Sequence, residues 1–245
     1  MVELITDTTT LDRILDSFNV KNRRKRWRLA KEPSIDDLIR HGNLQGELGL
    51  ALEYGHKRIY AYNGGKTGVS NCKRTVNLRL HNHPDEPELQ IFPSADDAIY
   101  IAKGKFNIEY IITPQGVSQV TYIGKWKIES KYTERKTKIS FQIKERVGLR
   151  SKEIIEVADK TSKEACNILR ERLRDYDAPV AISHMPCLPK KQRLTPKERS
   201  MYHCDITFLP WQDFARLYAK QGFWKVFSQD FDWSKVDYDS LRKAA

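Results

Sequence analysis

Two histidines separated by one residue carry the clearest chemical signal in this chain. His81 and His83 stand in the run His-Asn-His-Pro, directly after the strand-like stretch 75–80. Alternate residues of a strand project to the same face, so both imidazoles can be directed at one point. Carboxylates that could add a ligand, Asp96 and Asp97, open the next apolar segment. Two imidazoles, one carboxylate and a position left to water are typical of a catalytic zinc site.

The elements around these histidines predict a mixed α/β (α+β) unit. From residue 34 onward, hydrophobic periodicity and turn residues predict the order helix, strand, strand, strand, helix, strand, strand. The corresponding ranges are 34–41, 46–54, 59–62, 75–80, 94–104, 108–113 and 117–123. The first helix is expected to start with Ser34 as its cap and Asp37 three residues later. We expect this order to form a sheet with few helices.

Two further regions flank this unit. Residues 1–33 predict a short amphipathic helix and a basic connector, and residues 125–245 predict a basic α+β extension with an aromatic tail, either as its own domain or wrapped around the central sheet. The extension is expected to contain strands at 136–144 and 206–208, helices at 161–178 and 213–218, and a basic loop with prolines at 186–200. We therefore divide the chain into 1–33, 34–124 and 125–245.

The motif resembles the JAMM motif of the MPN/JAB family of metal-dependent isopeptidases. A Glu on an upstream strand, His-x-His-Pro, and Ser-x-x-Asp at a helix start are matched by Glu47, His81, His83, Ser94 and Asp97. The resemblance covers residues 34–124. The interval between His83 and Ser94 is longer than in the family, and Asn82 replaces the common Ser or Thr.

The resemblance implies an MPN-like mixed sheet and a role for each matching residue. His81, His83 and Asp97 would hold Zn²⁺. Glu47 would act as the general base, and Ser94 would donate its hydroxyl to the oxyanion. The implied activity is zinc-dependent hydrolysis of a peptide or isopeptide bond in a protein substrate.

The same residues also have structural interpretations. Ser94-x-x-Asp97 is an ordinary helix capping arrangement, in which Asp97 reaches back to the cap. Glu53 is expected on the same strand face as Glu47 and could serve in its place. A second cluster, formed by His184, Cys187, His203 and Cys204, matches no standard zinc spacing.

Composition places the chain among folded intracellular proteins. It has 245 residues, of which 40% are hydrophobic and 10% aromatic. The sequence has no apolar run long enough for a membrane span and no charged-then-apolar leader, so we expect no membrane association. Four scattered cysteines favour reduced thiols, hence the cytoplasm or nucleus, of a host cell if the protein is viral.

The net charge of +11 is concentrated in one stretch. Residues 125–200 contain 20 Lys and Arg against 11 Asp and Glu. Such a surface attracts nucleic acid or acidic proteins, and an evenly solvated Lys-rich surface is the competing interpretation. The residues expected to bind nucleic acid or a partner are Arg23, Arg24, Lys25, Arg26, Lys190, Lys191 and Arg193.

These features support two other functions besides hydrolysis. The basic region, the proline-rich loop and the aromatic tail fit a non-catalytic MPN-fold component of a large assembly, such as a viral particle or a ribonucleoprotein. They also fit a nucleic-acid-binding module, whose affinity would fall steeply with salt.

Overall fold

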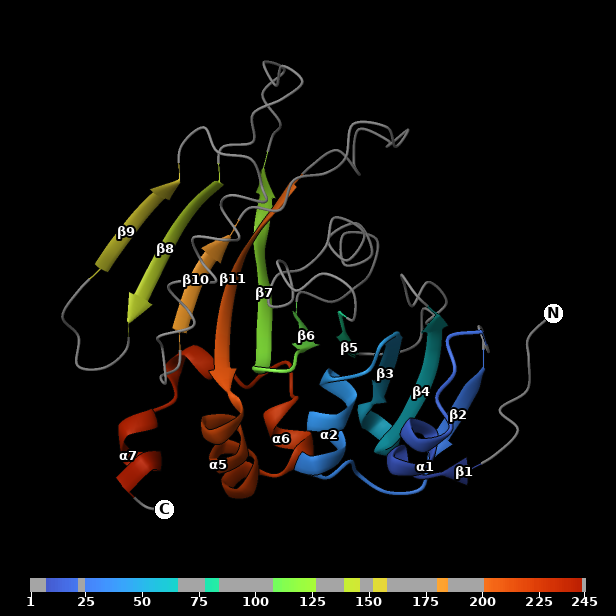
Figure 1. Ribbon diagram of the computed structural model, residues 1–245. Coiled ribbons are helices and arrows are strands. Elements are labelled where there is room, and N and C mark those ends of the chain that lie inside the picture. Colours follow the sequence, from blue (N-terminus) through green and yellow to red (C-terminus); the bar gives the residue numbers. More distant parts are fainter. Residues whose placement is uncertain are drawn as a thin grey trace, which may run out of the picture.

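The protein is a mixed α+β structure in which one large sheet is packed against helices (Figure 1). A computed structural model describes residues 8–21, 25–65, 78–83, 108–126, 139–145, 152–157, 180–184 and 201–243. Its helices are α1 (Leu11–Asp16), α2 (Ile35–Gly42), α5 (Trp211–Gln221), α6 (Phe223–Val226) and α7 (Tyr238–Lys243), with 3-10 turns η1 (Tyr54–His56) and η2 (Trp233–Lys235). The longest of these described helices has 11 residues, and none is long and apolar enough to cross a bilayer.

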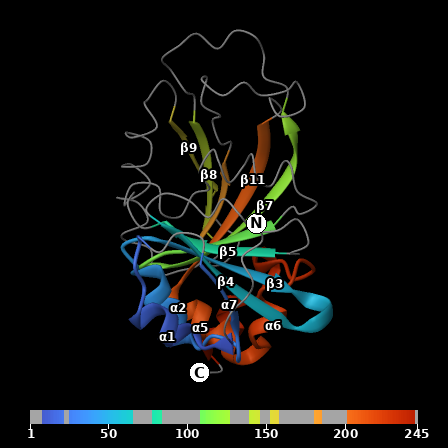
Figure 2. The same ribbon diagram turned by 90° about the vertical axis from the view of Figure 1, so that its right-hand side faces the viewer.

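The described strands form a single sheet of eleven strands in the order β1-β2-β4-β3-β5-β6-β7-β11-β10-β8-β9. The bounds are β1 Thr8–Thr9, β2 Arg26–Leu29, β3 Glu47–Glu53, β4 Arg58–Gly65, β5 Leu78–Asn82, β6 Ile108–Ile112, β7 Gly116–Trp126, β8 Ile139–Glu145, β9 Lys152–Val157, β10 Val180–His184 and β11 Met201–Pro210. Among these strands, β1 with β2 and β5 with β6 pair in parallel, and the other pairs are antiparallel. Strands β7 and β11 extend well beyond the layer of helices (Figure 2).

Helix α2 starts at a capping box, as the sequence predicts. The Ser34 hydroxyl accepts a hydrogen bond from the Asp37 amide at 3.1 Å, and the Asp37 carboxylate accepts one from the Ser34 amide at 2.9 Å. These two bonds satisfy backbone donors that a helix start otherwise leaves open. The helix ends at Gly42, where an added Cβ would lie 2.5 Å from the Thr113 carbonyl oxygen. Helix α2 therefore packs closely against the end of β6.

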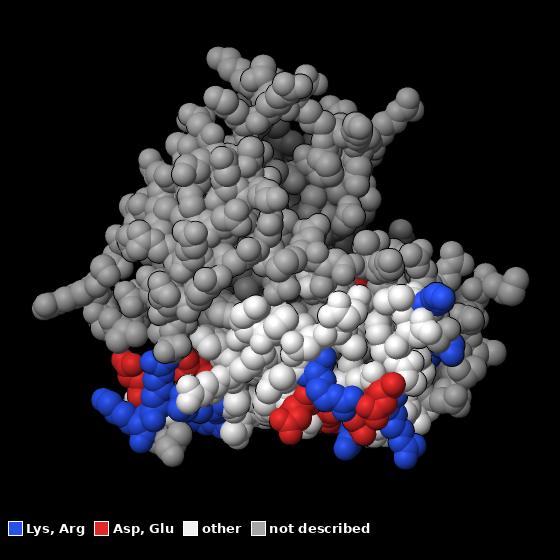
Figure 3. All heavy atoms as spheres, viewed as in Figure 1, with Lys and Arg blue, Asp and Glu red and all other residues white. Residues whose placement is uncertain are grey.

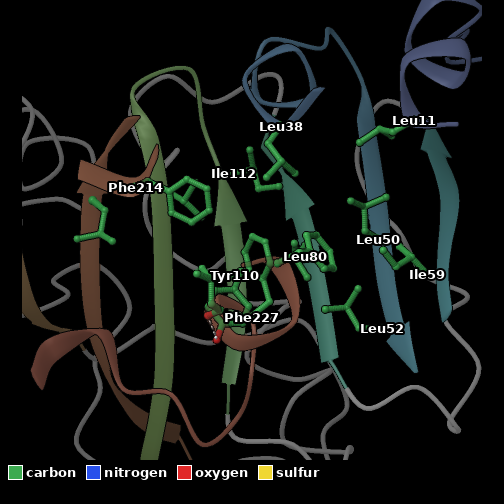
Figure 4. Packing of buried hydrophobic residues seen from close by; sticks show 14 of the residues in the cluster. Leu11, Leu38, Leu50, Leu52, Ile59, Leu80, Tyr110, Ile112, Phe214 and Phe227 are labelled. Carbon is green, nitrogen blue, oxygen red and sulfur yellow. Dashed lines mark hydrogen bonds between the residues drawn. The ribbon is translucent and has the colours of Figure 1, made fainter. Parts of the chain in front are cut away.

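Alternating residues of the central strands divide between two faces of the sheet. Leu48, Leu50 and Leu52 of β3 join Leu80 and Tyr110 in the main hydrophobic core, together with side chains of α1, α2 and α5 (Figure 4). The residues between them face the other way, where Ala51, Tyr60 and Tyr62 form a separate small cluster. We call these the helix face and the opposite face.

The C-terminal aromatic residues complete the core of the helix face. Phe214, Phe227 and Trp233 are fully buried, and the Tyr110 ring meets Phe227 edge-on at 5.0 Å between ring centroids. Gln119 of β7 donates to the Phe231 carbonyl oxygen and accepts from the Trp233 amide. The chain after Pro210 thus folds back onto strands β6 and β7.

The predicted elements and the structure agree over most of the described sheet. Strands predicted at 46–54, 59–62, 75–80, 108–113, 117–123, 136–144 and 206–208 correspond to β3, β4, β5, β6, β7, β8 and β11, and the helices predicted at 34–41 and 213–218 to α2 and α5. The helices predicted at 94–104 and 161–178 lie outside the described residues.

The connector interpretation of the first basic run is wrong for residues 26–29, which form strand β2. Leu29 is buried there, and Trp27 packs against the main core. Strands β9 and β10 were also not predicted. The strand was not predicted because the basic residues of this run dominate its composition. In β2 they alternate with apolar residues, so that Arg26 and Arg28 lie on one face and Trp27 and Leu29 on the other.

Candidate functional site

The two histidines of the motif converge at the end of β5. His81 is the fourth residue of the strand and is fully buried, and the partly buried His83 follows its last residue. Their Nε2 atoms are 2.8 Å apart and their ring centroids 4.8 Å apart. At this distance one ring nitrogen can donate a hydrogen bond to the other. The sequence predicts this convergence from the i, i+2 spacing.

The geometry of the pair is close to what a metal ion needs. Two imidazole nitrogens bound to one tetrahedral zinc at about 2.0–2.1 Å are separated by roughly 3.3 Å. The observed separation of 2.8 Å requires a small opening, which side-chain rotation can supply. The donor set of neutral imidazoles is one that zinc prefers. His81 and His83 thus fit as two ligands of such an ion.

Glu47 begins β3, the strand that pairs with the strand of His81. In the antiparallel ladder of β3 and β5, Gly49 is opposite His81. Alternate residues of a strand share a face, so Glu47 lies on the face of Gly49 and therefore on that of His81. Glu47 is 6% exposed. A buried carboxylate thus lies on the same face of the sheet as the histidine pair.

A bulge sets the start of β3. Glu47 pairs with Gly65 of β4 while Leu48 pairs with Asn63, which leaves Gly64 as an extra residue. Bulges of this kind often re-aim side chains beside functional sites. The alternation of β3 itself is preserved, so Glu47 keeps the face of Gly49 and Ala51.

Glu53, the other candidate base, lies at the far end of β3. It stands six residues from Glu47, a separation of about 20 Å along a strand. Its carboxylate accepts a hydrogen bond from the Tyr60 hydroxyl at 3.3 Å and lies 3.9 Å from Arg58. Glu53 is therefore engaged away from the histidine pair, and Glu47 stands at the end of β3 that is nearer to His81.

The remaining candidate ligands fall outside the described part of the chain. Ser94, Asp97 and the alternative Asp96 are among residues 84–107, so their positions are not described. Among the described residues, no group of three or more His, Cys, Asp or Glu side chains could hold a metal ion. A third ligand for His81 and His83 has to come from outside those residues.

The second histidine and cysteine cluster is described only through its backbone. In the ladder of β10 and β11, His184 is opposite Cys204, and His203 precedes a register shift. Neighbouring strand residues such as His203 and Cys204 point to opposite faces in a regular strand. Cys187 lies outside the described residues.

The basic residues proposed for partner binding are described in part. Lys25 is exposed, whereas the Arg26 guanidinium stacks over the rings of Tyr60 and Tyr62 at 4.4 and 4.9 Å from their centroids. Arg23, Arg24, Lys190, Lys191 and Arg193 lie outside the described residues. On the face shown in Figure 3, described charges of both signs alternate along the lower edge.

Two buried polar residues on the opposite face were missed by the sequence analysis. Glu109 of β6 is fully buried, and the pairing of His81 with Ile111 places Glu109 on the histidine face. Ser118 of β7, which pairs with Ile111, is also fully buried, and its hydroxyl has no hydrogen-bond partner among the described residues. A glutamate inside the apolar run Ile-Glu-Tyr-Ile-Ile is the signal that could have identified Glu109.

On the helix face, a hydrogen bond from His41 of α2 holds the backbone at the start of β3. The fully buried His41 of α2 lies 2.7 Å from the Leu48 carbonyl oxygen through its Nε2. Burial lowers the pKa of His41 to about 4, so the ring is neutral near pH 7. Because a carbonyl only accepts, Nε2 carries the proton. Helix α2 is thereby tied to the start of β3.

The structure brings two imidazoles into contact on the face of the sheet that also carries the buried Glu47, and two imidazoles can serve as two ligands of a metal ion. Comparison of the chain with family models, with curated proteins and with solved structures found no match.

Proposed function

We propose that this protein is a zinc-dependent hydrolase of peptide or isopeptide bonds, with an MPN-like arrangement of its central strands. The observation that carries the proposal is the 2.8 Å approach of the His81 and His83 Nε2 atoms, next to the strand that begins with Glu47. The order α2, β3, β4, β5 followed by the β6–β7 hairpin supports the fold assignment.

In this proposal His81 and His83 provide two zinc ligands and Asp97 the third. Bound there, the metal would supply Lewis acidity that lowers the pKa of water and polarises a carbonyl group. Glu47 accepts a proton from the attacking water on its carboxylate and returns it to the leaving amine. Ser94 donates its hydroxyl to the oxygen on which negative charge develops.

Glu47 is 6% exposed, so its carboxylate is largely shielded from bulk water.

Metal analysis of the purified full chain tests this proposal. We expect about one zinc ion per wild-type chain and almost none in His81→Ala/His83→Ala. His56→Ala is the matched control, because His56 is exposed on η1 and takes no part in the site. Equal zinc in the double variant and the wild type would contradict the proposal.

Activity separates the hydrolase from its alternative. The hydrolase is expected to cleave isopeptide-linked ubiquitin-like conjugates, with loss of cleavage in Glu47→Gln. A metal-free protein that cleaves none of them and co-purifies stably with a large particle would instead be the non-catalytic assembly component.

A further inference from the structure

The residue between the two histidines bonds to the backbone on both sides of Glu47. Asn82 Oδ1 accepts a hydrogen bond from the Leu48 amide at 2.8 Å, and Asn82 Nδ2 donates to the Gly46 carbonyl oxygen at 3.1 Å. The Gly46 carbonyl belongs to the peptide group before Glu47, and the Leu48 amide to the one after it. One side chain thus holds both peptide groups that flank the glutamate.

The two hydrogen bonds of the Asn82 side chain replace backbone hydrogen bonds between β3 and β5, which end before Glu47. The ladder between β3 and β5 runs from Leu52 opposite Leu78 to Gly49 opposite His81, and Glu47 lies beyond its end. The primary amide of Asn82 has one acceptor and two donors, so it can imitate a peptide group of a neighbouring strand. The side chain is fully buried, which increases the cost of losing either bond.

We propose that Asn82 is a positioning residue, which fixes the Glu47 carboxylate relative to the His81 and His83 imidazoles. This inference rests on the proposed zinc site. Asn82 stands between the two histidines in the chain and bonds to the backbone of the segment that carries Glu47. It therefore limits how far the proposed base can move relative to the two proposed ligands. It touches neither substrate nor metal in this role.

The network behind Asn82 acts on the same peptide groups. His41 holds the Leu48 carbonyl oxygen while Asn82 holds the Leu48 amide, so both polar groups of Leu48 are fixed by side chains. The bulge at Gly64 alters the pairing with β4 on the other side of the same residues. Asn82 and His41 therefore replace regular ladder contacts where β3 begins.

A double-mutant cycle on zinc affinity tests the role of Asn82. Zn²⁺ is titrated into the full chain against a chromophoric chelator, for the wild type, Asn82→Ala, Glu47→Gln and the double variant. A carboxylate near the ion favours binding of the cation, so freeing the Glu47 carboxylate to move should weaken binding, and we expect a loss of about tenfold in Asn82→Ala. In the Glu47→Gln background we expect little further loss, because Asn82 acts through Glu47.

Controls separate positioning from general destabilisation. Asn63→Ala removes another buried amide near the bulge, one that donates to the Asn19 carbonyl oxygen at 2.9 Å, and should leave zinc affinity unchanged. Asn82→Ser keeps a hydroxyl, but the serine side chain is too short to make both hydrogen bonds. This variant should lose less zinc affinity than Asn82→Ala. Thermal unfolding of each variant identifies any that fail to fold, and Asn82→Ser then replaces Asn82→Ala in the cycle.

Hydrogen exchange of the Leu48 amide reports on the contact itself. We expect faster exchange of this amide in Asn82→Ala than in Asn63→Ala. If Asn82→Ala costs the same zinc affinity in the wild-type and the Glu47→Gln backgrounds, or costs none, the positioning role is overturned while the zinc site stands. A wild type that binds no zinc overturns the proposed function and the positioning role together.

Discussion

On the helix face of the central sheet, the buried side chains are mainly aliphatic and aromatic. Leu50, Leu80 and Tyr110 lie there, and the Gln119 amide bonds to Tyr110, Phe231 and Trp233. On the opposite face, Glu47, His81 and Glu109 are buried together with the Ser118 hydroxyl. The apolar residues of the helix face and the polar residues of the opposite face come from the same strands, because successive residues of a strand point to opposite faces.

This difference assigns separate roles to the two faces. Apolar burial supplies most of the favourable free energy of folding, so the helix face is expected to dominate stability. Buried ionisable groups are costly for folding and cluster at functional sites. Substitutions should therefore separate into those that affect unfolding and those that affect metal binding.

The largest expected effect on stability is from Phe214→Ala. Phe214 is fully buried, and its ring centroid lies 5.8, 5.7 and 5.5 Å from those of Trp211, Phe227 and Trp233 and 6.0 Å from that of Tyr218. Removing its ring leaves a cavity, and the free energy of unfolding should fall by about 3–5 kcal/mol. Denaturant unfolding measures this change, with the exposed Gln212→Ala on the same helix as control. A loss below about 1 kcal/mol would contradict the assignment of this face.

His41 should make stability depend on pH. Its pKa is lowered by burial to about 4 in the folded protein, against 6.5 for an ordinary histidine. A lowered pKa means that the unfolded chain binds the proton more readily, so stability is full above pH 6.5 and falls as pH decreases toward 4. The loss should reach about 3 kcal/mol.

The variant His41→Gln isolates this contribution. It keeps an N–H donor for the Leu48 carbonyl but does not titrate, so its stability should fall less between pH 6.5 and 4. Equal slopes in the wild type and the variant would show that other groups cause the pH dependence.

Asp213→Ala should have a smaller effect. The buried Asp213 carboxylate accepts hydrogen bonds from Arg242 at 2.9 and 2.7 Å and lies 3.3 Å from Arg216. Both arginines are partly exposed, at 31% and 26%, so water can solvate them after the change. We expect a loss of about 2 kcal/mol by thermal unfolding. The exposed pair of Asp232 and Lys235 offers the control, since Lys235→Ala should change stability by less than about 0.5 kcal/mol.

The smallest effect is expected for Arg26→Ala on the opposite face. Its guanidinium stacks over Tyr60 and Tyr62, and such contacts contribute about 0.5–1 kcal/mol each. Denaturant unfolding should show a loss of about 1 kcal/mol, and none for the exposed Lys25→Ala. A loss as large as that of Phe214→Ala would remove the distinction between the two faces.

The sequence predicted the parts of this fold that local patterns determine. Apolar alternation identified β3 and β4, and the Ser34 and Asp37 pair located the start of α2. The spacing of His81 and His83 predicted that their rings converge. Each of these depends on residues that are close together in the chain.

Other features depend on contacts between distant residues. The placement of Glu47 on the strand next to His81 follows from the pairing of β3 with β5, which no local pattern encodes. The hydrogen bonds of Asn82 to Gly46 and Leu48 join residues 36 and 34 positions apart. Strand β2 was not predicted because arginines make up half of it. Its apolar residues, Trp27 and Leu29, are recognised as core residues only from their packing against distant parts of the chain.

A zinc ion held by His81 and His83 beside Glu47 is central to the proposed function. Anomalous scattering at the zinc edge from crystals of the wild-type protein tests it most directly. We predict a peak about 2.0–2.1 Å from both Nε2 atoms, with those atoms separated by roughly 3.3 Å. A histidine pair that keeps its 2.8 Å contact in the presence of zinc, with no peak between the rings, would contradict this prediction.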